Sequence, residues 1–133
     1  MSTSRLLSVL LVDDSRFLRA RLRRLLEESD TRCVVMEAGT VTAAAKALQS
    51  LRPDVVVLDL NLPDGSGFDL LPGIKRASPQ SVVILLTNHD GPAIRKRATS
   101  LGADHYFRKS TEFELVVMVM QRVAASLRAG EDS

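Results

Sequence analysis

The amino-acid sequence predicts an α/β fold: one five-stranded parallel sheet, doubly wound, with helices on both faces. Short runs of consecutive apolar residues alternate five times with segments of helical apolar spacing. The connections between them are short, which favours successive strands in one parallel sheet. The runs are continuous in apolar character, as is typical of strands that are covered on both faces.

Each predicted strand is an apolar run that ends in a polar residue or a turn signal. The clearest is VVVL at residues 55–58, which leads into Asp59 and a loop rich in Pro and Gly. An acid at the carboxyl end of a buried parallel strand lies where open α/β sheets bind ligands. The predicted strands cover residues 8–12, 33–37, 55–58, 81–86 and 104–107.

Helices are predicted where apolar residues recur at helical spacing. Pro72 and Gly73 interrupt the third helix, and a Pro inside a helix costs about 3 kcal/mol, so we expect that helix to be short, distorted or late-starting. The inner stripe of the second helix is expected to be Val41, Ala44, Ala45, Leu48 and Leu51. The first four helices are expected over residues 15–28, 40–51, 68–76 and 92–101.

The last helix is expected to open at Ser110 or Thr111, where Thr111 and Glu114 fit a capping box, and to run to about residue 128. Its inward stripe is predicted to be Phe113, Val116, Val117, Met120, Ala124 and Leu127. Three further apolar residues lie largely off that stripe: Leu115, Met118 and Val119. A helix that is apolar on two faces is fully buried or has a partner, so we expect an oligomer or partner contact here, with a slightly apolar surface as the alternative.

Composition and charge exclude several functions. The net charge is +2 with a pI of about 9.0, and arginines gather in residues 16–24 and 95–97. No aromatic residues interleave with these clusters, so we expect solvated helix faces and no direct nucleic-acid binding, with docking of an acidic partner as the functional alternative.

Cys33 is the single cysteine, which excludes a disulfide within the chain. No segment is long and apolar enough to span a membrane, so we expect a cytoplasmic protein without membrane contact.

Polar residues follow several predicted strands and therefore meet at one edge of the sheet. These residues are Asp13, Asp14, Asp59, Thr87 and Lys109. Two like charges about 4 Å apart repel by roughly 4 kcal/mol at an effective dielectric near 20. One lysine does not neutralise three acids, and oxygen-rich ligation suits a hard divalent cation, Mg²⁺ before Ca²⁺.

With a cation in place, Asp59 is a candidate phosphoryl acceptor. Aspartyl phosphates are a known form of covalent catalysis. Phosphoryl transfer depends on neutralising the phosphoryl oxygens, for which the metal, Lys109 and the Thr87 hydroxyl are available. A loop-capping role for Asp59 is the plainer alternative. A phosphatase with an aspartyl nucleophile is a further alternative, but it would want its acids as DxD after the first strand, where this chain has adjacent Asp13 and Asp14.

The motifs VDDS at 12–15, LDLNLPDGSG at 58–67, LLT at 85–87 and GADHYFRKS at 102–110 resemble the receiver domain of bacterial two-component response regulators. The resemblance covers about residues 6–128, so we expect residues 1–133 to form a single receiver domain of flavodoxin-like fold without an output domain. It implies a phosphoacceptor signalling domain that catalyses only its own phosphorylation and dephosphorylation. By that resemblance the site consists of Asp59 as the phosphorylated residue, Asp13, Asp14 and the Asn61 backbone carbonyl as further Mg²⁺ ligands, Thr87 and Lys109 as phosphoryl contacts, and Tyr106 as the aromatic of the switch.

The resemblance also implies partners. The phosphoryl donor is a histidine kinase or a histidine phosphotransfer protein, and the fourth helix, fifth strand and fifth helix form the face that a downstream protein or a second copy reads. The alternative is an interaction module that is independent of phosphorylation and acts through the apolar last helix. Two residues depart from the family pattern: Ser110 stands where Pro is usual, and Asn88 stands where a small residue is usual.

Overall fold

The computed structural model describes residues 6–88 and 91–132, with side chains up to residue 129. Five parallel strands form one sheet in the order β2-β1-β3-β6-β7, and two short antiparallel strands form a separate hairpin. The strands of the main sheet are β1 (Leu7–Val12), β2 (Cys33–Ala38), β3 (Val55–Leu58), β6 (Val82–Thr87) and β7 (His105–Arg108). The predicted parallel sheet is confirmed, and each predicted strand agrees to within one residue at either end.

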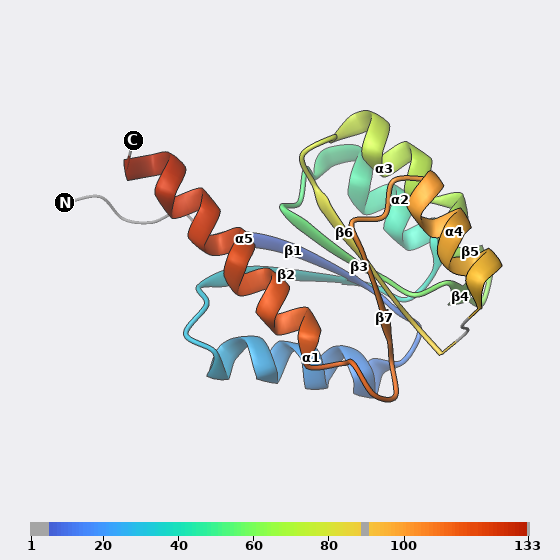
Figure 1. Ribbon diagram of the computed structural model, residues 1–133, viewed down its shortest axis with the longest axis horizontal. Coiled ribbons are helices and arrows are strands. Elements are labelled where there is room, and N and C mark those ends of the chain that lie inside the picture. Colours follow the sequence, from blue (N-terminus) through green and yellow to red (C-terminus); the bar gives the residue numbers. More distant parts are fainter. Residues whose placement is uncertain (1–5, 89–90, 133) are drawn as a thin grey trace.

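Helices cover both faces of this sheet, as predicted for a doubly wound fold. Helices α1 and α5 lie on one face, and α2, α3 and α4 lie on the other (Figure 1). The helices are α1 (Arg16–Glu28), α2 (Val41–Ser50), α3 (Leu71–Ala77), α4 (Pro92–Ser100) and α5 (Leu115–Asp132). In the part of the chain that the structure describes, no helix is both long and apolar enough to cross a lipid bilayer.

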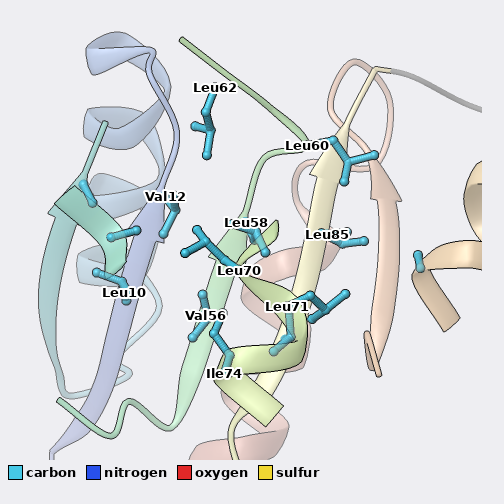
Figure 2. Close-up of a cluster of buried hydrophobic side chains, with 14 residues drawn as sticks. Leu10, Val12, Val56, Leu58, Leu60, Leu62, Leu70, Leu71, Ile74 and Leu85 are labelled. Carbon is cyan, nitrogen blue, oxygen red and sulfur yellow. The ribbon is translucent and has the colours of Figure 1, made fainter. Parts of the chain in front are cut away.

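Two apolar cores lie on opposite faces of the sheet because successive strand residues point to opposite sides. On one face Val56 and Leu58 of β3 pack with Leu70, Leu71 and Ile74 from the α3 region (Figure 2). On the other face Val55 and Val57 pack against residues of α1 and α5. Strand β3 is buried along its whole length, so Asp59 emerges from the most enclosed strand of the sheet.

The segment after Asp59 begins with a hairpin, which no sequence pattern indicated. Strands β4 (Asn61–Leu62) and β5 (Gly65–Ser66) pair antiparallel and are followed by a 3₁₀ turn, Gly67–Asp69. The helical pattern that starts at residue 68 becomes α-helix only at Leu71, and Pro72 falls in the first turn, where its missing N–H costs nothing. The expectation of a late-starting third helix is confirmed.

The predicted inner face of the second helix and the predicted start of the last helix are each wrong in part. Ala45 was assigned to the inner stripe of the second helix but is exposed, and Ala47 packs against the core in its place. The last helix begins at Leu115 and not at Ser110 or Thr111. The capping box of Thr111 with Glu114 is therefore wrong. Glu112 makes the local contacts there, since its side chain accepts from the Arg108 N–H at 3.0 Å and its own N–H donates to the Arg108 carbonyl at 2.8 Å.

The expected outer patch of the last helix is only partly exposed. Met118 is 49% exposed and Leu115 is half-buried, but Val119 is 6% exposed and belongs to the core under α5. The later start of the helix makes Leu115 its first residue. The assignment of Val119 to a contact face is therefore corrected, because its side chain packs inward.

Candidate functional site

The carboxyl edge of the sheet brings the predicted acids and the lysine together. Asp13 follows β1, Asp59 follows β3, and Lys109 follows β7. The Lys109 Nζ lies 2.7 Å from Asp13 Oδ2 and 2.8 Å from Asp59 Oδ2, so one ammonium bridges both carboxylates. Both aspartates are buried. A charge-assisted pair of this kind is strong, and it places the lysine against two acids from different strands.

Burial changes the proton affinity of this group of residues. Desolvation raises the pKa of Asp59 above its ordinary value, and the hydrogen bonds from Lys109 and from the Asn61 N–H only partly offset it. For Lys109, burial by itself lowers the pKa, but hydrogen bonds to Asp13 and Asp59 outweigh it and leave the pKa raised. The lysine therefore stays charged at neutral pH, while the Asp59 carboxylate is held in an environment that disfavours its charge.

Asp14 completes a cluster with the chemistry of a hard-cation site. One carboxylate oxygen from each of Asp13, Asp14 and Asp59 lies within 4.8 Å of the others. Two ligands on opposite sides of an Mg²⁺ ion lie about 4.2 Å apart, and Ca²⁺ ligands lie up to about 5.2 Å apart. The donors are all carboxylate oxygens, and Asp14 is exposed and so open to solvent. The chemistry and the spacing of these oxygens therefore fit a divalent cation.

The backbone around Asp59 is held by its own loop. Asp59 Oδ1 accepts from the Asn61 N–H at 3.2 Å, and the Gly67 N–H donates to the Leu60 carbonyl at 2.9 Å. A Cβ on Gly67 would lie 2.3 Å from the Asp59 carbonyl oxygen, so glycine is required there. Asp64 in the hairpin turn accepts from the N–H groups of Val41 and Thr42 at 2.7 and 3.0 Å. The loop that carries Asn61 is thereby fastened to the start of α2.

Two further residues of the predicted site, Thr87 and Tyr106, belong to the neighbouring strands β6 and β7. Thr87 is buried at the end of β6, and the Lys109 N–H donates to its carbonyl at 3.0 Å. Tyr106 in β7 is half-buried and packs against the core on the α3 face. The Arg95 guanidinium of α4 lies over its ring, 4.6 Å from the ring centroid. The peptide bond before Ser110 is trans, as are the other peptide bonds in the described residues.

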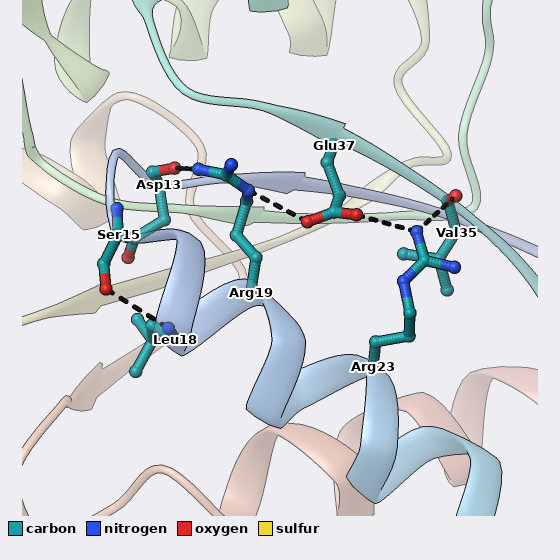
Figure 3. Close-up of polar contacts among 7 residues, drawn as sticks. All are labelled: Asp13, Ser15, Leu18, Arg19, Arg23, Val35 and Glu37. Atoms are coloured by element: carbon teal, nitrogen blue, oxygen red, sulfur yellow. Dashed lines mark hydrogen bonds and ion pairs between the residues drawn. The ribbon is translucent and has the colours of Figure 1, made fainter.

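One residue near the acids was missed by the sequence analysis. Arg19 in α1 donates through a guanidinium N–H to the backbone carbonyl of Asp13, as Figure 3 shows. Its Nε also pairs with Glu37 Oε1 at 2.9 Å, and Arg23 pairs with Glu37 Oε2 at 2.8 Å. The arginine run had indicated a solvated face, with docking of an acidic partner as the alternative. The sequence signal that could have identified Arg19 is its position one turn after Ser15, the N-cap of α1.

The fold and the site together define a class of protein. It is an α/β domain with an acidic pocket and a lysine at the carboxyl edge of its parallel sheet. Residues 9–121 match the family model described as the response regulator receiver domain. The chain belongs to this family. Receiver domains are phospho-accepting signalling domains of two-component response regulators, they are phosphorylated by histidine kinases, and they bind a divalent metal at the acidic pocket.

Individual relatives agree with this assignment. The chain is 34% identical over 115 residues to Protein CcdB of Bacillus subtilis, covering 86% of this chain and 95% of that protein. It is 31% identical over 118 residues to the nitrate/nitrite response regulator protein homolog of Haemophilus influenzae, covering 89% of this chain and 57% of that protein. The chain therefore spans little more than half the length of that regulator.

A solved structure adds a chemical parallel. A response regulator protein from Burkholderia pseudomallei, crystallised with a phosphorylated aspartic acid, a calcium ion and citrate, superposes with a TM-score of 0.77 at 26% identity. The match covers 94% of this chain and 72% of that chain. In that protein, a phosphorylated aspartic acid and a divalent cation occur together.

Proposed function

We propose that Asp59 is the residue of this chain that accepts the phosphoryl group. The observation that carries the proposal is the bridge from Lys109 Nζ to Asp59 Oδ2 at 2.8 Å, beside two further aspartates within 4.8 Å. A carboxylate oxygen of Asp59 forms the new bond to phosphorus, and the bond from phosphorus to the donor breaks. Phosphoryl transfer of this kind needs positioned charge more than covalent chemistry.

The chain's other residues have distinct roles in this proposal. Asp13, Asp14, Asp59 and the Asn61 backbone carbonyl hold the cation, for which Mg²⁺ is the proposed identity. When bound, the cation neutralises charge on the phosphoryl oxygens. Lys109 binds a second phosphoryl oxygen, and the Thr87 hydroxyl binds a third. The chain acts only on its own Asp59, in phosphorylation and dephosphorylation, and not on a diffusible substrate.

A histidine kinase or a histidine phosphotransfer protein is the proposed donor, and α1 is the proposed docking surface. Phe17 is 79% exposed in the first turn of α1, close in sequence to Asp13 and Asp14. It borders a hollow of about 320 Å³ that is also lined by Arg21 and Arg24. An apolar anchor with arginines around it suits a partner surface with an apolar centre and an acidic rim.

The proposed reading face for a downstream protein or a second copy is formed by α4, β7 and α5. A hollow of about 240 Å³ lies between His105 and Phe107 of β7 and Leu115, Met118 and Arg122 of α5. Met118 is the most exposed apolar residue there. The alternative, an interaction module that needs no phosphorylation, is not favoured, because the acids and the lysine of the site are all present and the lysine contacts Asp13 and Asp59.

Incubation with Mg²⁺ and acetyl phosphate tests the proposal. Intact mass should rise by one phosphoryl group in the wild-type protein and not in the Asp59→Asn variant. Tyr106 is the only tyrosine and there is no tryptophan, so tyrosine fluorescence on addition of beryllofluoride reports on the switch aromatic alone. Unchanged mass and unchanged fluorescence in the wild-type protein would contradict the proposed function.

A further inference from the structure

Two loops at the carboxyl edge are joined by hydrogen bonds that continue past the end of the sheet. Thr87, the last residue of β6, lies opposite Arg108, the last residue of β7. Just beyond, the Lys109 N–H donates to the Thr87 carbonyl at 3.0 Å. The next N–H, that of Ser110, donates to the Asn88 side-chain Oδ1 at 3.0 Å. The second bond is therefore an additional contact made through a side chain, outside the backbone ladder of the sheet.

The bond depends on both residues that depart from the family pattern. A proline at position 110 would have no N–H to donate. Ser110 supplies that donor, and Asn88 supplies an acceptor across 22 positions of sequence. An alanine at position 88 could not accept this bond. The two departures thus compensate each other in one contact, which we call the Asn88–Ser110 clip.

The position of the clip connects it to the site. Asn88 directly follows Thr87, and Ser110 directly follows Lys109, whose Nζ contacts Asp13 and Asp59. The clip therefore fixes the separation of the two residues that supply the hydroxyl and the ammonium. The Lys109 N–H bond to the Thr87 carbonyl lies next to the clip and joins the same two loops.

We propose that Asn88 is a positioning residue that, through the Ser110 N–H, holds Lys109 in register with Thr87 for phosphoryl transfer to Asp59. The proposal rests on the proposed function of Asp59. Reactivity of this kind is sensitive to displacements of the supporting groups by about 1 Å. Because the clip is one solvent-exposed hydrogen bond beside the Lys109–Thr87 backbone bond, its loss should lower the phosphorylation rate constant by about 3- to 10-fold.

Three variants separate the clip from general effects of mutation. Asn88→Ala removes the acceptor, Ser110→Pro removes the donor, and Ser110→Ala keeps the N–H and serves as the matched control. The rate constant for phosphorylation by acetyl phosphate at saturating Mg²⁺ should fall in the first two and stay within about 2-fold of wild type in the control, which keeps the hydrogen bond. In the Asn88→Ala/Ser110→Pro double variant the loss should equal that of one single variant, because both remove the same bond.

Hydrogen exchange gives a readout that does not depend on activity. The Ser110 amide should exchange slowly in the wild type and in Asp59→Asn, and fast in Asn88→Ala. Additive losses in the double variant, or equal amide exchange with and without Asn88, would overturn the clip. A different result is that the Ser110 amide is protected but no protein, wild type included, is phosphorylated. The proposed role of Asp59 then fails. The hydrogen bond exists in that case but has no catalytic consequence, so the positioning role of Asn88 is overturned as well.

Discussion

The guanidinium of Arg95 lies over the ring of Tyr106, with its Cζ 4.6 Å from the ring centroid. An exposed cation–π pair contributes about 0.5–1 kcal/mol. The pair holds the tyrosine in the position that it has in this structure. Any movement of the ring on phosphorylation must therefore break or remake a contact with α4.

Removal of this contact should make the tyrosine easier to move. We expect Arg95→Ala to lower the beryllofluoride concentration at half-maximal change in Tyr106 fluorescence by about 2- to 5-fold, which corresponds to the energy of the pair. The matched control is Arg97→Ala on the same helix, because the Arg97 guanidinium lies over Phe68, 4.7 Å from that ring centroid. Equal midpoints in wild type and Arg95→Ala would show that the pair does not restrain the ring.

Cation binding should stabilise the fold by relieving repulsion among the acids. A ligand at about ten times its dissociation constant stabilises by about 1.4 kcal/mol, or about 4–7 °C in Tm for a domain of this size. We expect Mg²⁺ to raise Tm by this amount.

Asp59→Asn should raise the metal-free Tm at neutral pH, because burial raises the pKa of Asp59 and its ionised form therefore destabilises the fold above that pKa. The same variant should respond less to Mg²⁺; differential scanning fluorimetry measures both, and a full Mg²⁺ response in Asp59→Asn would remove Asp59 from the ligand set.

Two glycines in neighbouring segments should respond in opposite directions to the same substitution. Gly67→Ala would place a Cβ 2.3 Å from the Asp59 carbonyl oxygen, and overpacking of this kind costs about 1–3 kcal/mol. Gly73→Ala in α3 meets no atom within 4 Å, and removing a helical glycine stabilises by about 0.5–1 kcal/mol. Urea unfolding measures both changes. A neutral Gly67→Ala would show that the Asp59 loop moves freely.

The single cysteine should react slowly with thiol reagents at neutral pH. Burial raises the pKa of the Cys33 thiol above its ordinary value of 9.0; Arg23 partly offsets this and Glu27 adds to it. Labelling with a chromogenic disulfide should therefore reach half its limiting rate at a pH above 9.0. The thiol ionises first in the unfolded chain, so this group's contribution to stability is present below pH 9.0 and declines as the pH rises through the folded pKa. Arg23→Ala should move the labelling midpoint further upward, and a midpoint below that of free cysteine would contradict the assignment.

Substitutions at two adjacent residues of α5, Met118 and Val119, should have very different effects on stability. Met118→Glu alters a side chain that is 49% exposed and should leave Tm within about 2 °C of wild type, since exposed substitutions seldom exceed 0.5 kcal/mol. Val119→Glu buries a charge at a position that is 6% exposed and should destabilise strongly. If the protein dimerises with beryllofluoride through this face, sedimentation should show that Met118→Glu prevents it. A dimer that persists in Met118→Glu would place the contact elsewhere.

Much of the fold follows from patterns that are local in sequence. The apolar runs at Leu7–Val12 and Val55–Leu58 can be satisfied only between two helical layers, so the parallel sheet and the edge that gathers Asp13, Asp59 and Lys109 are predictable. The interrupted pattern at Pro72 likewise indicates the late start of α3. Burial within a helix is less predictable, because a stripe identifies a face and not which of its residues meets the sheet, as Ala45 and Val119 show.

The sequence by itself determined which residue types reach the carboxyl edge, because all strands of a parallel sheet end at the same edge. Only the tertiary structure decided how those residues are held. The bridge of Lys109 to Asp13 and Asp59, the Arg19 contact with the Asp13 carbonyl and the bond from Ser110 to Asn88 each join segments far apart in the chain. Such contacts depend on the direction and reach of individual side chains across packed elements, which periodicity in the sequence does not encode.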